Sequence, residues 1–401
     1  MPERPVLIVG AGIVGLSLAN GLRKKNIPFQ VFERDDNIAT RDQGWAITIH
    51  WALGFLRSLL SEKAFNGIED TQVDPEVGRN DTGNFLFIDL ASLETKFRIP
   101  PNDRRRVNRD KIRKLLLKEV SEEVHWNKRF VGIEEIEGGG VVAVFEDGSR
   151  VEGSVIVGAE GSNSRTRQLV APETYRNTQL PVRLTGTAVD FKPEQVKPLR
   201  DLDPLLFQGC HPSSSTFLWV SMIDTPESNG TQGTDDERYR VQILMSWPYK
   251  SPEDEVKHTQ AERLKEMKRR AEVFHENLRG TIQSMPEDTN CVEIVLQDWP
   301  CLDWDNHGGR VTLAGDAAHA MTMYRGEAAN HGILDALRLC EALEAVYTGA
   351  QGMEDAILEF EKELRGRAIP AVLLSRQACL DAHDLAGLNE HSAVLKRRAI
   401  N

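Results

Sequence analysis

Acidic, basic and small residues meet in residues 313–336, LAGDAAHAMTMYRGEAANHGILDA, where a strand-like pattern gives way to a helix-like one. Charged side chains rarely occupy such crossings without a partner. An acid beside the free backbone amides of a helix start suits a ligand that carries hydroxyl groups and negative charge. The polar residues that stand there among alanines and glycines are Asp316, His319, Arg325, Glu327 and Asn330.

A glycine-rich turn near the N-terminus has the spacing G-x-G-x-x-G of a dinucleotide-binding motif. An apolar run that ends at Val9 precedes it and a helix-like pattern follows, so the helix start offers free amides to a pyrophosphate. Glu33, about 20 residues further on, is placed to accept hydrogen bonds from an adenosine ribose, with Arg34 beside it. The sequence therefore predicts a dinucleotide site at Gly10, Gly12, Ile13, Val14 and Gly15.

The two turns together distinguish between the common dinucleotides. A nicotinamide enzyme has no use for a second nucleotide-type turn late in the chain, whereas a long flavin dinucleotide extends from one turn to the other. Asp316 would accept hydrogen bonds from ribityl hydroxyls, and the amides of residues 326–330 would stabilise negative charge on a reduced flavin ring. In the alternative, Asp316 is a helix cap that binds only backbone amides.

The composition excludes several classes of protein. The chain of 401 residues has a formal net charge of -12, which argues against a protein that follows nucleic-acid phosphates. Its most basic cluster, residues 104–106, lies among acids and is expected to be a solvated turn. Five scattered cysteines without a CxxC spacing argue against a metal site, and no apolar run is long enough for a membrane span. Because no signal-peptide pattern is present, we expect a cytoplasmic protein.

Strand and helix patterns place both turns on a parallel sheet. Residues 5–9 and 29–32 have the pattern of buried strands with a helix between them, which is a βαβ unit. Residues 309–314 predict another buried strand, followed by helices to about residue 385. A hairpin is predicted where Asp147 and Gly148 supply a type I′ turn, and its returning strand leads into a further glycine turn at residues 158–161.

A mainly β section is inserted between these elements. Residues 183–191, 216–223 and 239–247 have strand patterns, and residues 253–279 predict a charged helix. The predicted fold class is α/β: a Rossmann-like FAD-binding domain interleaved with a smaller antiparallel β-sheet substrate domain, plus C-terminal helices. Four large side chains on the inserted strands would line an apolar substrate pocket or form sheet core: Trp219, Met222, Met245 and Trp247.

Three ordered motifs resemble those of a known enzyme family. They are GAGIVG with Glu33, GAEGSNSRTR at residues 158–167, and GDAAHAMTMYRGEAANHGILDA from Gly315. Together they resemble the FAD-dependent aromatic monooxygenases of the p-hydroxybenzoate hydroxylase type. The phrases QGWAITIHWAL, DRRRVNRDKIRKLLL and DWPCLDWDNHGGRVTLAGDAAH resemble the fungal secondary-metabolism branch. The resemblance covers nearly the whole chain and is weakest over residues 176–290.

The resemblance implies one tightly bound FAD, which NADPH or NADH reduces and which then reacts with O2 to give a C4a-hydroperoxide that delivers one oxygen atom. It implies that Arg109 reaches the phosphate or ribityl side of FAD and that Asp316 binds the ribityl hydroxyls. Arg41, Gly44 and Trp45 fall at the family's loop beside the mobile flavin ring. The residues implied at the ring itself are Gly326, Ala328, Ala329 and Asn330.

Three residues depart from the family pattern. Glu160 stands where the middle motif usually has Asp, so the charge is kept and its reach is shifted. Met323 replaces a common proline, and Ala328 replaces a glycine that lies close to the flavin. These exchanges keep open an alternative in which the protein catalyses a non-redox isomerisation or cyclisation. Arg165 and Arg167, after the middle turn, either meet a phosphate or cap a helix.

His50, Tyr324 and Arg325 are the catalytic candidates. His50 or Tyr324 would act as a base or hydrogen-bond acceptor that raises the electron density of a phenol or indole. Arg325 would steady an anionic substrate or the flavin. The structural alternatives are a satisfied core histidine for His50 and an ion pair with Glu327 for Arg325.

The predicted function is that of an FAD-dependent monooxygenase, an oxidoreductase that hydroxylates or epoxidises an aromatic or indole-type secondary metabolite and is able to trigger rearrangement or cyclisation. A NAD-dependent dehydrogenase or a nucleotide sensor would leave the two later motifs without a role. The expected partners are the substrate, O2 and NAD(P)H, with no nucleic acid and no membrane span. The FAD-binding domain is expected at residues 1–75, 105–175 and 290–385, the substrate domain at 76–104 and 176–289, and a tail at 386–401.

Overall fold

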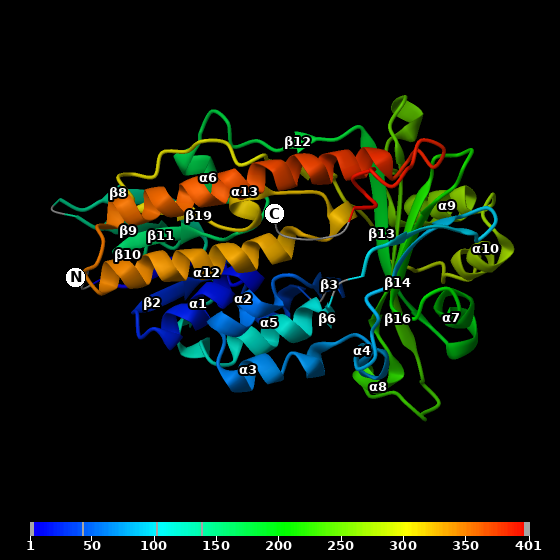
Figure 1. Cartoon of the computed structure of the whole chain (residues 1–401), viewed down its shortest axis with the longest axis horizontal. Helices are drawn as coiled ribbons and strands as arrows, with labels where there is room; N and C mark the ends of the chain where they lie inside the picture. Colours follow the sequence, from blue (N-terminus) through cyan, green and yellow to red (C-terminus); the bar gives the residue numbers. More distant parts are fainter. Residues whose placement is uncertain (1–3, 42–43, 102, 138, 397–401) are drawn as a thin grey trace.

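A five-stranded parallel sheet is the centre of one half of the molecule (Figure 1). The computed structural model describes residues 4–41, 44–101, 103–137 and 139–396. The strand order is β19-β11-β1-β2-β7, and all neighbouring pairs are parallel. The early and late strand predictions are therefore confirmed in a single sheet, made of β1 (Val6–Val9), β2 (Phe29–Phe32), β7 (Val124–His125), β11 (Val155–Gly158) and β19 (Val311–Leu313).

Two helices from opposite ends of the chain pack closely beside this sheet. They are α1 (Ile13–Lys24) and α12 (Ala328–Tyr347), and α13 (Met353–Asp381) runs alongside α12 (Figure 1). The close approach depends on glycine, because a Cβ on Gly332 would lie only 2.4 Å from Cγ2 of Val14. The late helix start is thereby fixed against the early one.

A small antiparallel sheet completes this half. It contains β8 (Phe130–Glu135), β9 (Val141–Phe145) and β10 (Arg150–Gly153). The hairpin between β9 and β10 is confirmed, but its type I′ turn is not: only Gly148 (φ 82°) has a positive φ, whereas type I′ requires two such residues. Phe145 pairs with Ser149, so the loop has three residues and ends in a left-handed glycine.

A seven-stranded, mainly antiparallel sheet forms the other half. Its order is β17-β13-β16-β15-β14-β4-β5, and the three long strands predicted in the inserted section are β13, β15 and β16. The strands are β4 (Phe85–Asp89), β5 (Thr95–Ile99), β13 (Val182–Phe191), β14 (Leu206–Cys210), β15 (Phe217–Asp224), β16 (Tyr239–Pro248) and β17 (Cys291–Glu293).

Helices α7 (Pro193–Arg200), α9 (Gln260–Ala271) and α10 (Glu276–Gln283) lie on the side of this sheet away from α12 and α13 (Figure 1). The single charged helix predicted over residues 253–279 is wrong, because two helices occupy that region. Thr259 caps α9 and His275 caps α10, and buried Phe274 lies between them. The predicted α/β class with interleaved sheets and C-terminal helices is confirmed.

A two-stranded antiparallel sheet, β3 (Ala46–Ile49) and β6 (Arg105–Asn108), lies between the halves. The prediction of a solvated turn at residues 104–106 is wrong: Arg104 and Arg106 are only 6% and 4% exposed. The remaining elements are α2 (Leu53–Leu59), α3 (Glu62–Asn66), α4 (Pro75–Gly78), α5 (Arg109–Leu117), α6 (Arg165–Val170), α8 (Pro226–Asn229), α11 (Asp316–His319), β12 (Thr178–Gln179), β18 (Gln297–Asp298), η1 (Ile38–Arg41), η2 (Glu69–Thr71), η3 (Ser121–Glu123), η4 (Pro252–Asp254) and η5 (Met323–Arg325).

The two halves have separate hydrophobic cores. One joins the parallel sheet to α1, α12 and α13, and the other joins the seven-stranded sheet to α9 and α10 and includes Val394 and Leu395 near the C-terminus. None of the helices in the described ranges is long and apolar enough to cross a membrane.

Candidate functional site

A cavity of about 330 Å³ opens at the carboxyl ends of β1, β2, β11 and β19. Parallel α/β sheets bind their ligands at this edge. Gly15, Gly44, Trp45, Gly326 and Asn330 lie outside the lining. The residues predicted for the cofactor that do line the cavity are Gly10, Gly12, Ile13, Val14, Glu33, Arg34, Arg109, Glu160, Asp316, Ala328 and Ala329.

The three motif glycines have different roles. Gly10 has φ 109°, and a Cβ there would lie 2.5 Å from the carbonyl oxygen of Ala159. A Cβ on Gly15 would lie 2.0 Å from the carbonyl oxygen of Gly10, so both glycines are needed to close the turn itself. A Cβ on Gly12 would meet nothing within 4 Å, and Gly12 lines the cavity. The space beside Gly12 is therefore available to a ligand.

Glu33 lies at the end of β2 with its carboxylate facing the glycine turn. Its Oε2 accepts a hydrogen bond from the amide of Ala11 (2.9 Å), and Nη2 of Arg113 lies 3.6 Å from the same oxygen. Arg113 also donates through Nε to the carbonyl of Ala11 (2.8 Å). Arg113 was missed by the sequence analysis, although it follows Arg109 by four residues on α5 and so shares its helix face.

The cavity is strongly basic even though the chain as a whole is acidic. Three carboxylates line it, those of Glu33, Glu160 and Asp316, and twice as many cations. This balance suits a ligand with two phosphate groups. The cations are Arg34, Arg109, Arg113, Lys128, Arg129 and Arg165.

Glu160 holds the middle glycine turn together. One carboxylate oxygen accepts from the amide and hydroxyl of Thr166 (2.9 and 2.8 Å), and the other accepts from the hydroxyl of Ser164 (2.7 Å). These bonds fix the start of α6, which Ser164 caps. Burial raises the pKa of Glu160, and the three hydrogen bonds act in the opposite direction. The longer side chain at this position is thus accommodated by local donors.

Arg165 and Arg167, which follow Glu160, differ in role. Arg165 lines the cavity, whereas Arg167 is buried over the ring of Trp299 (4.8 Å). Arg167 donates to the carbonyls of Asp316 and Ala317 (3.3 Å each) and to that of Ser162. It therefore joins the middle and late turns through their backbones.

Asp316 is the first residue of α11 and lines the cavity. Burial raises its pKa, opposed by the charges of His319, Arg109 and Arg167. Within the described ranges no group donates a hydrogen bond to this carboxylate, so the helix-cap alternative is not what this structure contains. The carboxylate is placed to accept hydrogen bonds from a ligand.

Asp335 on α12 organises the turn that precedes Asp316. It accepts hydrogen bonds from the amide of Gly315 (2.8 Å), from Nε2 of His319 (2.6 Å) and from Nη2 of Arg367 (2.6 Å). His319 and Asp335 are fully buried, and the neighbouring cations hold the pKa of Asp335 well below its usual range. His319 therefore supports the cavity wall and does not line it.

The first three residues of α12 differ in whether they line the first cavity. Ala328 and Ala329 line the cavity, and no side chain caps the helix start within the described part of the chain. Asn330 is fully buried: its Oδ1 accepts from the amide of His50 (2.9 Å), and its Nδ2 donates to the carbonyl of Thr48 (2.9 Å). Asn330 thus ties α12 to β3 with both ends of its amide.

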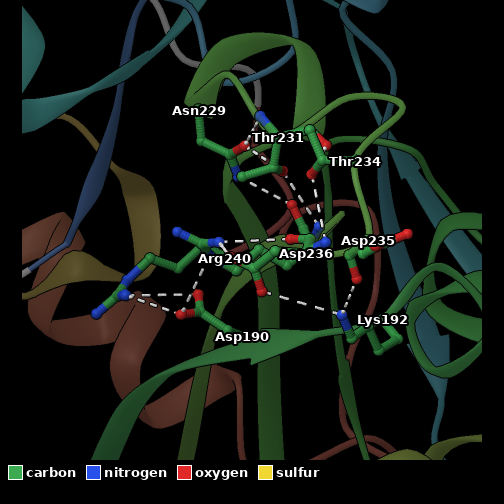
Figure 2. Close-up of polar contacts among 9 residues, drawn as sticks. Asp190, Lys192, Asn229, Thr231, Thr234, Asp235, Asp236 and Arg240 are labelled. Atoms are coloured by element: carbon green, nitrogen blue, oxygen red, sulfur yellow. Dashed lines mark hydrogen bonds and ion pairs between the residues drawn. The ribbon is translucent and has the colours of Figure 1, made fainter.

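The segment before β3 meets the seven-stranded sheet. A Cβ on Gly44 (φ 57°) would lie 3.1 Å from Nε of Arg240, and Arg240 points toward Asp190 on the neighbouring strand (Figure 2). The loop that leads into β16 is held by bonds such as that from Nζ of Lys192 to the carbonyl of Asp235 (3.1 Å; Figure 2).

Two further residues of that segment were predicted beside the flavin ring. The carbonyl of Trp45 accepts from the amide of Arg109 (2.9 Å), which fixes the segment beside the cavity. Arg41 ends η1, and its side chain lies outside the described residues.

A second cavity, of about 40 Å³, lies between β3 and the seven-stranded sheet. It adjoins the first: Ile47 lines the first and Thr48 the second, and Ala328 lines the first and Gly326 the second. Its wall combines rings and aliphatic groups with a few polar side chains, which is the composition of small-molecule sites. Its lining is Thr48, His50, Gly83, Phe85, Ile99, Pro100, Arg104, Leu206, Trp219, Arg325 and Gly326.

Two of the three predicted catalytic residues, His50 and Arg325, lie at this second cavity. Arg325 is buried, pairs through Nε with Glu327 (2.6 Å) and donates through Nη1 to the carbonyl of Ala393 (2.6 Å). The ion-pair alternative for Arg325 is therefore present in the structure. Nε2 of His50 lies 3.3 Å from Nδ2 of Asn330.

Tyr324 lines neither cavity and lies fully buried in the core of the sheet half. Its hydroxyl donates to Oγ of Ser246 (2.8 Å), and Ser246 lies 2.9 Å from Nε2 of His383. Burial raises the pKa of Tyr324 well above its ordinary value, which further removes it from a role as a base. The catalytic role predicted for Tyr324 stays a prediction, and the structure places this side chain away from both cavities, because η5 directs it into the core.

The neutral state of His383 predicts a loss of stability in mild acid. Burial lowers its pKa to about 4, whereas an unfolded histidine binds a proton near pH 6.5. The stabilisation is complete above about pH 6.5 and is lost as the pH falls toward 4, at about 1.4 kcal/mol per pH unit. His383→Asn should therefore flatten the pH dependence of the melting temperature in that range. His391→Gln, at an exposed histidine, is the control, and an unchanged slope in His383→Asn would contradict this assignment.

The four large side chains predicted to line a substrate pocket lie in two different places, one at the second cavity and three in the sheet core. Trp219 lines the second cavity, but Met222, Met245 and Trp247 are buried sheet core. Trp247 lies beneath the guanidinium of Arg270 (3.9 Å) and donates to the carbonyl of Asp254 (2.8 Å). A period-two pattern identifies the buried face of a strand but not which buried residues border a cavity.

The first cavity fits FAD on three independent observations. The space beside Gly12 accepts a close backbone approach, the six cations suit a pyrophosphate, and the free carboxylate of Asp316 suits ribityl hydroxyls. The start of α12, which has no side-chain cap in the described ranges, offers backbone amides to the same cavity. No one of these features depends on the others.

Comparison with known proteins agrees with this fit. Residues 3–373 match the sequence model of a family described as FAD binding domain. The chain is 42% identical over 412 residues to a protein of Arthroderma benhamiae named "Probable FAD-dependent monooxygenase", covering 98% of this chain and 95% of that one. It is 43% identical over 362 residues to the FAD-dependent monooxygenase dbaB of Emericella nidulans, covering 89% and 91%.

Solved structures share the fold. That of 2,6-dihydroxypyridine-3-hydroxylase from Arthrobacter nicotinovorans superposes with a TM-score of 0.75 at 16% identity, covering 100% of this chain and 99% of that one. That of Klebsiella pneumoniae HpxO, complexed with FAD and uric acid, superposes with a TM-score of 0.74 at 19% identity, covering 96% and 90%. At these identities the likeness concerns the fold alone.

Proposed function

The chain belongs to the FAD binding domain family and is an FAD-dependent monooxygenase of the p-hydroxybenzoate hydroxylase type, with fungal relatives, and from this premise we propose that it oxidises an aromatic or indole-type secondary metabolite with NADPH or NADH as reductant. The oxidation is a hydroxylation or an epoxidation, able to trigger rearrangement or cyclisation of the product.

The observation that carries this proposal is the shared boundary of the two cavities. Neighbouring residues of β3, Ile47 and Thr48, face different cavities, as do Ala328, the first residue of α12, and Gly326, two residues before it. A cofactor in the basic cavity and an aromatic molecule against Phe85 and Trp219 would therefore meet at this boundary. The bound FAD supplies the redox chemistry, and the protein supplies position and electrostatics.

The roles of the protein groups follow from their places. Gly12 and the start of α1 would receive the pyrophosphate, with Arg109, Arg113 and Arg165 opposite its charge. Asp316 would orient the ribityl chain, while Glu33 would bind the adenosine ribose once its bond to the Ala11 amide is shared or released. The backbone amides at the start of α12 would stabilise negative charge at the ring.

At the second cavity, His50 would accept a proton or hydrogen bond from the substrate, and Arg325, already neutralised by Glu327, would shape the pocket. We propose the domain boundaries given above, supported by the two separate cores. A cytoplasmic location is also part of the proposal, supported by five free cysteines.

The test is an anaerobic visible spectrum of the purified, FAD-loaded protein, before and after addition of NADPH or NADH, with and without candidate phenols and indoles. We expect the yellow band to bleach, faster when the correct substrate is present, and air to restore it with formation of an oxygenated product. A protein that stays yellow with both nucleotides and every aromatic tested would refute the proposed use of NAD(P)H.

A further inference from the structure

Exposed aliphatic side chains gather along one long helix. Seven large hydrophobic side chains are exposed in the described part of the chain; four lie on α13 and two in the segment between β17 and β19. Ion pairs of Arg376 with Asp298 (2.6 Å) and of Arg365 with Asp303 (3.2 Å) fix that segment to α13. Single exposed apolar residues are normal, whereas a group of them marks an interaction surface. The six residues are Leu358, Ile369, Leu373 and Leu380 on α13, and Val295 and Leu302 beside it.

The four side chains on α13 form one stripe along the helix and are between 36% and 48% exposed. They are separated by 11, 4 and 7 residues, and each of these spacings is close to a whole number of helical turns. The inner side of α13, which spans both halves of the molecule (Figure 1), is packed into both cores, through residues such as Phe360 in one and Cys379 in the other. The stripe therefore faces away from everything that the single chain packs against.

Gly366 lies in the same stripe, exposed and in the middle of the helix. A Cβ on Gly366 would meet nothing within 4 Å, so no contact within the described chain requires a glycine at this position. Glycine destabilises a helix interior relative to alanine. It also lets a large side chain of another molecule approach the backbone closely. The stripe thus offers a shallow depression among aliphatic side chains.

Opposite charges without a partner stand toward the two ends of the stripe. Lys362 lies near its start, and Asp384 follows the end of α13. Both residues are exposed, and neither forms an ion pair with any of the described residues. By contrast, the next two cations of the helix, Arg365 and Arg367, are each paired with a carboxylate. Lys362 and Asp384 are therefore available to pair with groups of another molecule.

These positions complement one another when α13 packs against an antiparallel copy of itself. Gly366 and Leu380 lie seven residues on either side of Leu373, and Lys362 and Asp384 lie eleven residues on either side. With Leu373 on a twofold axis, Leu380 of each copy packs over Gly366 of the other, and Lys362 of each copy faces Asp384 of the other. Every contact of such an interface is made twice, which is the property of a twofold dimer.

We propose that this stripe, with Val295 and Leu302 beside it, is the interface of a homodimer in which two copies of α13 pack antiparallel around Leu373. The exposed side chains are all aliphatic and lack the tryptophan and tyrosine of membrane-interface segments, and the chain carries a net charge of -12, so a second copy fits the surface better than an anionic bilayer. One helix pair with a flanking segment is a small interface, so we expect a Kd on the order of 10 µM.

Sedimentation equilibrium of the FAD-loaded protein, from about 1 to about 100 µM, tests the dimer on both sides of this Kd. We expect the mass to rise toward twice that of the chain. Leu373→Asp should raise the Kd at least about a hundredfold, because it places two carboxylates against each other in an apolar contact. Val273→Asp is the matched control, at an exposed valine between α9 and α10, and should dimerise like the parent. A parent that stays monomeric, or a Leu373→Asp protein that dimerises like the parent, would overturn the proposal.

The charge pair tests the antiparallel arrangement. Lys362→Glu and Asp384→Lys should each weaken the dimer about fivefold, because each turns two attractions into two repulsions at an exposed site. The double variant Lys362→Glu/Asp384→Lys restores opposite charges and should return the Kd close to the parental value. A double variant weaker than either single variant would show that the two residues do not face each other, and the proposed pairing would fall.

A cysteine on the axis provides a positive signal. Leu373→Cys should form an intermolecular disulfide under mild oxidation, because the two copies of residue 373 meet. Leu358→Cys is equally exposed but should not, since its two copies would lie about 45 Å apart at 1.5 Å per residue. The five native cysteines are buried, so they contribute little background. Disulfides in both variants would indicate a parallel pair and overturn the proposal.

A lipid arm tests the rival occupant. The parent should stay in solution when vesicles of phosphatidylcholine and phosphatidylserine are sedimented. A monomeric parent that sediments with the vesicles, and a Leu373→Asp protein that does not, would assign the stripe to a membrane surface and refute the dimer. None of these measurements needs turnover, so the outcome is independent of the proposed function.

Discussion

Replacing Asp316 with alanine is expected to weaken FAD binding by about a hundredfold while the protein stays folded. The carboxylate lines the first cavity and accepts no hydrogen bond from the described residues, so its oxygens are available to two ribityl hydroxyls. Hydrogen bonds to a charged group contribute about 1.5 kcal/mol or more each, and the loss of two corresponds to about a hundredfold in Kd. Titration of FAD into the apoprotein, followed by flavin fluorescence, measures this change.

The same substitution should not destabilise the apoprotein. Burial raises the pKa of Asp316, which means that its charged form is unfavourable until a ligand is bound. We therefore expect the FAD-free variant to melt at the parental temperature or slightly above it. Asp303→Ala, at a fully exposed carboxylate in the preceding loop, is the control for both measurements. An Asp316→Ala protein that binds FAD as tightly as the parent would show that the ribityl assignment is wrong.

The parts of the site that were predicted from sequence are those whose geometry is local. Gly10 and Gly15 close one turn within six residues, Gly12 leaves space for a ligand beside it, and Glu33 lies at the end of the adjacent strand. Asp316 follows from the same logic, because a strand end and a helix start determine where its side chain emerges. All of these residues except Gly15 line one cavity, as the motif spacing indicated.

The parts that were missed depend on partners from distant segments. The sequence places Arg104, Arg105 and Arg106 among acids, but it does not say which arginine is left without one. Asp81 and Glu69 approach from one side, and Ser221 comes from a strand far along the chain. Only the register of β3 with β6, which pairs Thr48 with Arg106, shows that this arginine lies behind the second cavity.

Side-chain direction is the second limit of the sequence. Tyr324 and Arg325 are neighbours in a motif, yet the η5 turn sends Tyr324 into the sheet core and Arg325 to the wall of the second cavity. A helix-like composition likewise does not reveal the break between Ala271 and Glu276, where the ring of Phe274 is buried and His275 caps α10. Motif proximity therefore identifies the region of a site but not the groups that reach it.

The largest effect on stability is expected for Asp335→Asn. Asp335 is fully buried, pairs with Arg367 and is hydrogen-bonded to His319 at the same time, at 2.6 Å from each. Removal of its charge leaves two buried donors facing a neutral amide, and the loss of one member of such a network costs about 3–5 kcal/mol of unfolding free energy. Chemical denaturation of the FAD-free protein measures this loss.

The effect should extend to the cofactor, because Asp335 also accepts from the amide of Gly315 and so fixes the turn that presents Asp316. In the double variant Asp335→Asn/Arg367→Gln, removal of the opposing charge should recover part of the lost stability. It should not recover FAD affinity, since the bond to Gly315 remains altered. If the double variant were as unstable as the sum of its single variants, the two residues would not act as a pair. If FAD affinity were parental in Asp335→Asn, the turn before Asp316 would be fixed by the strand and helix alone, without this carboxylate.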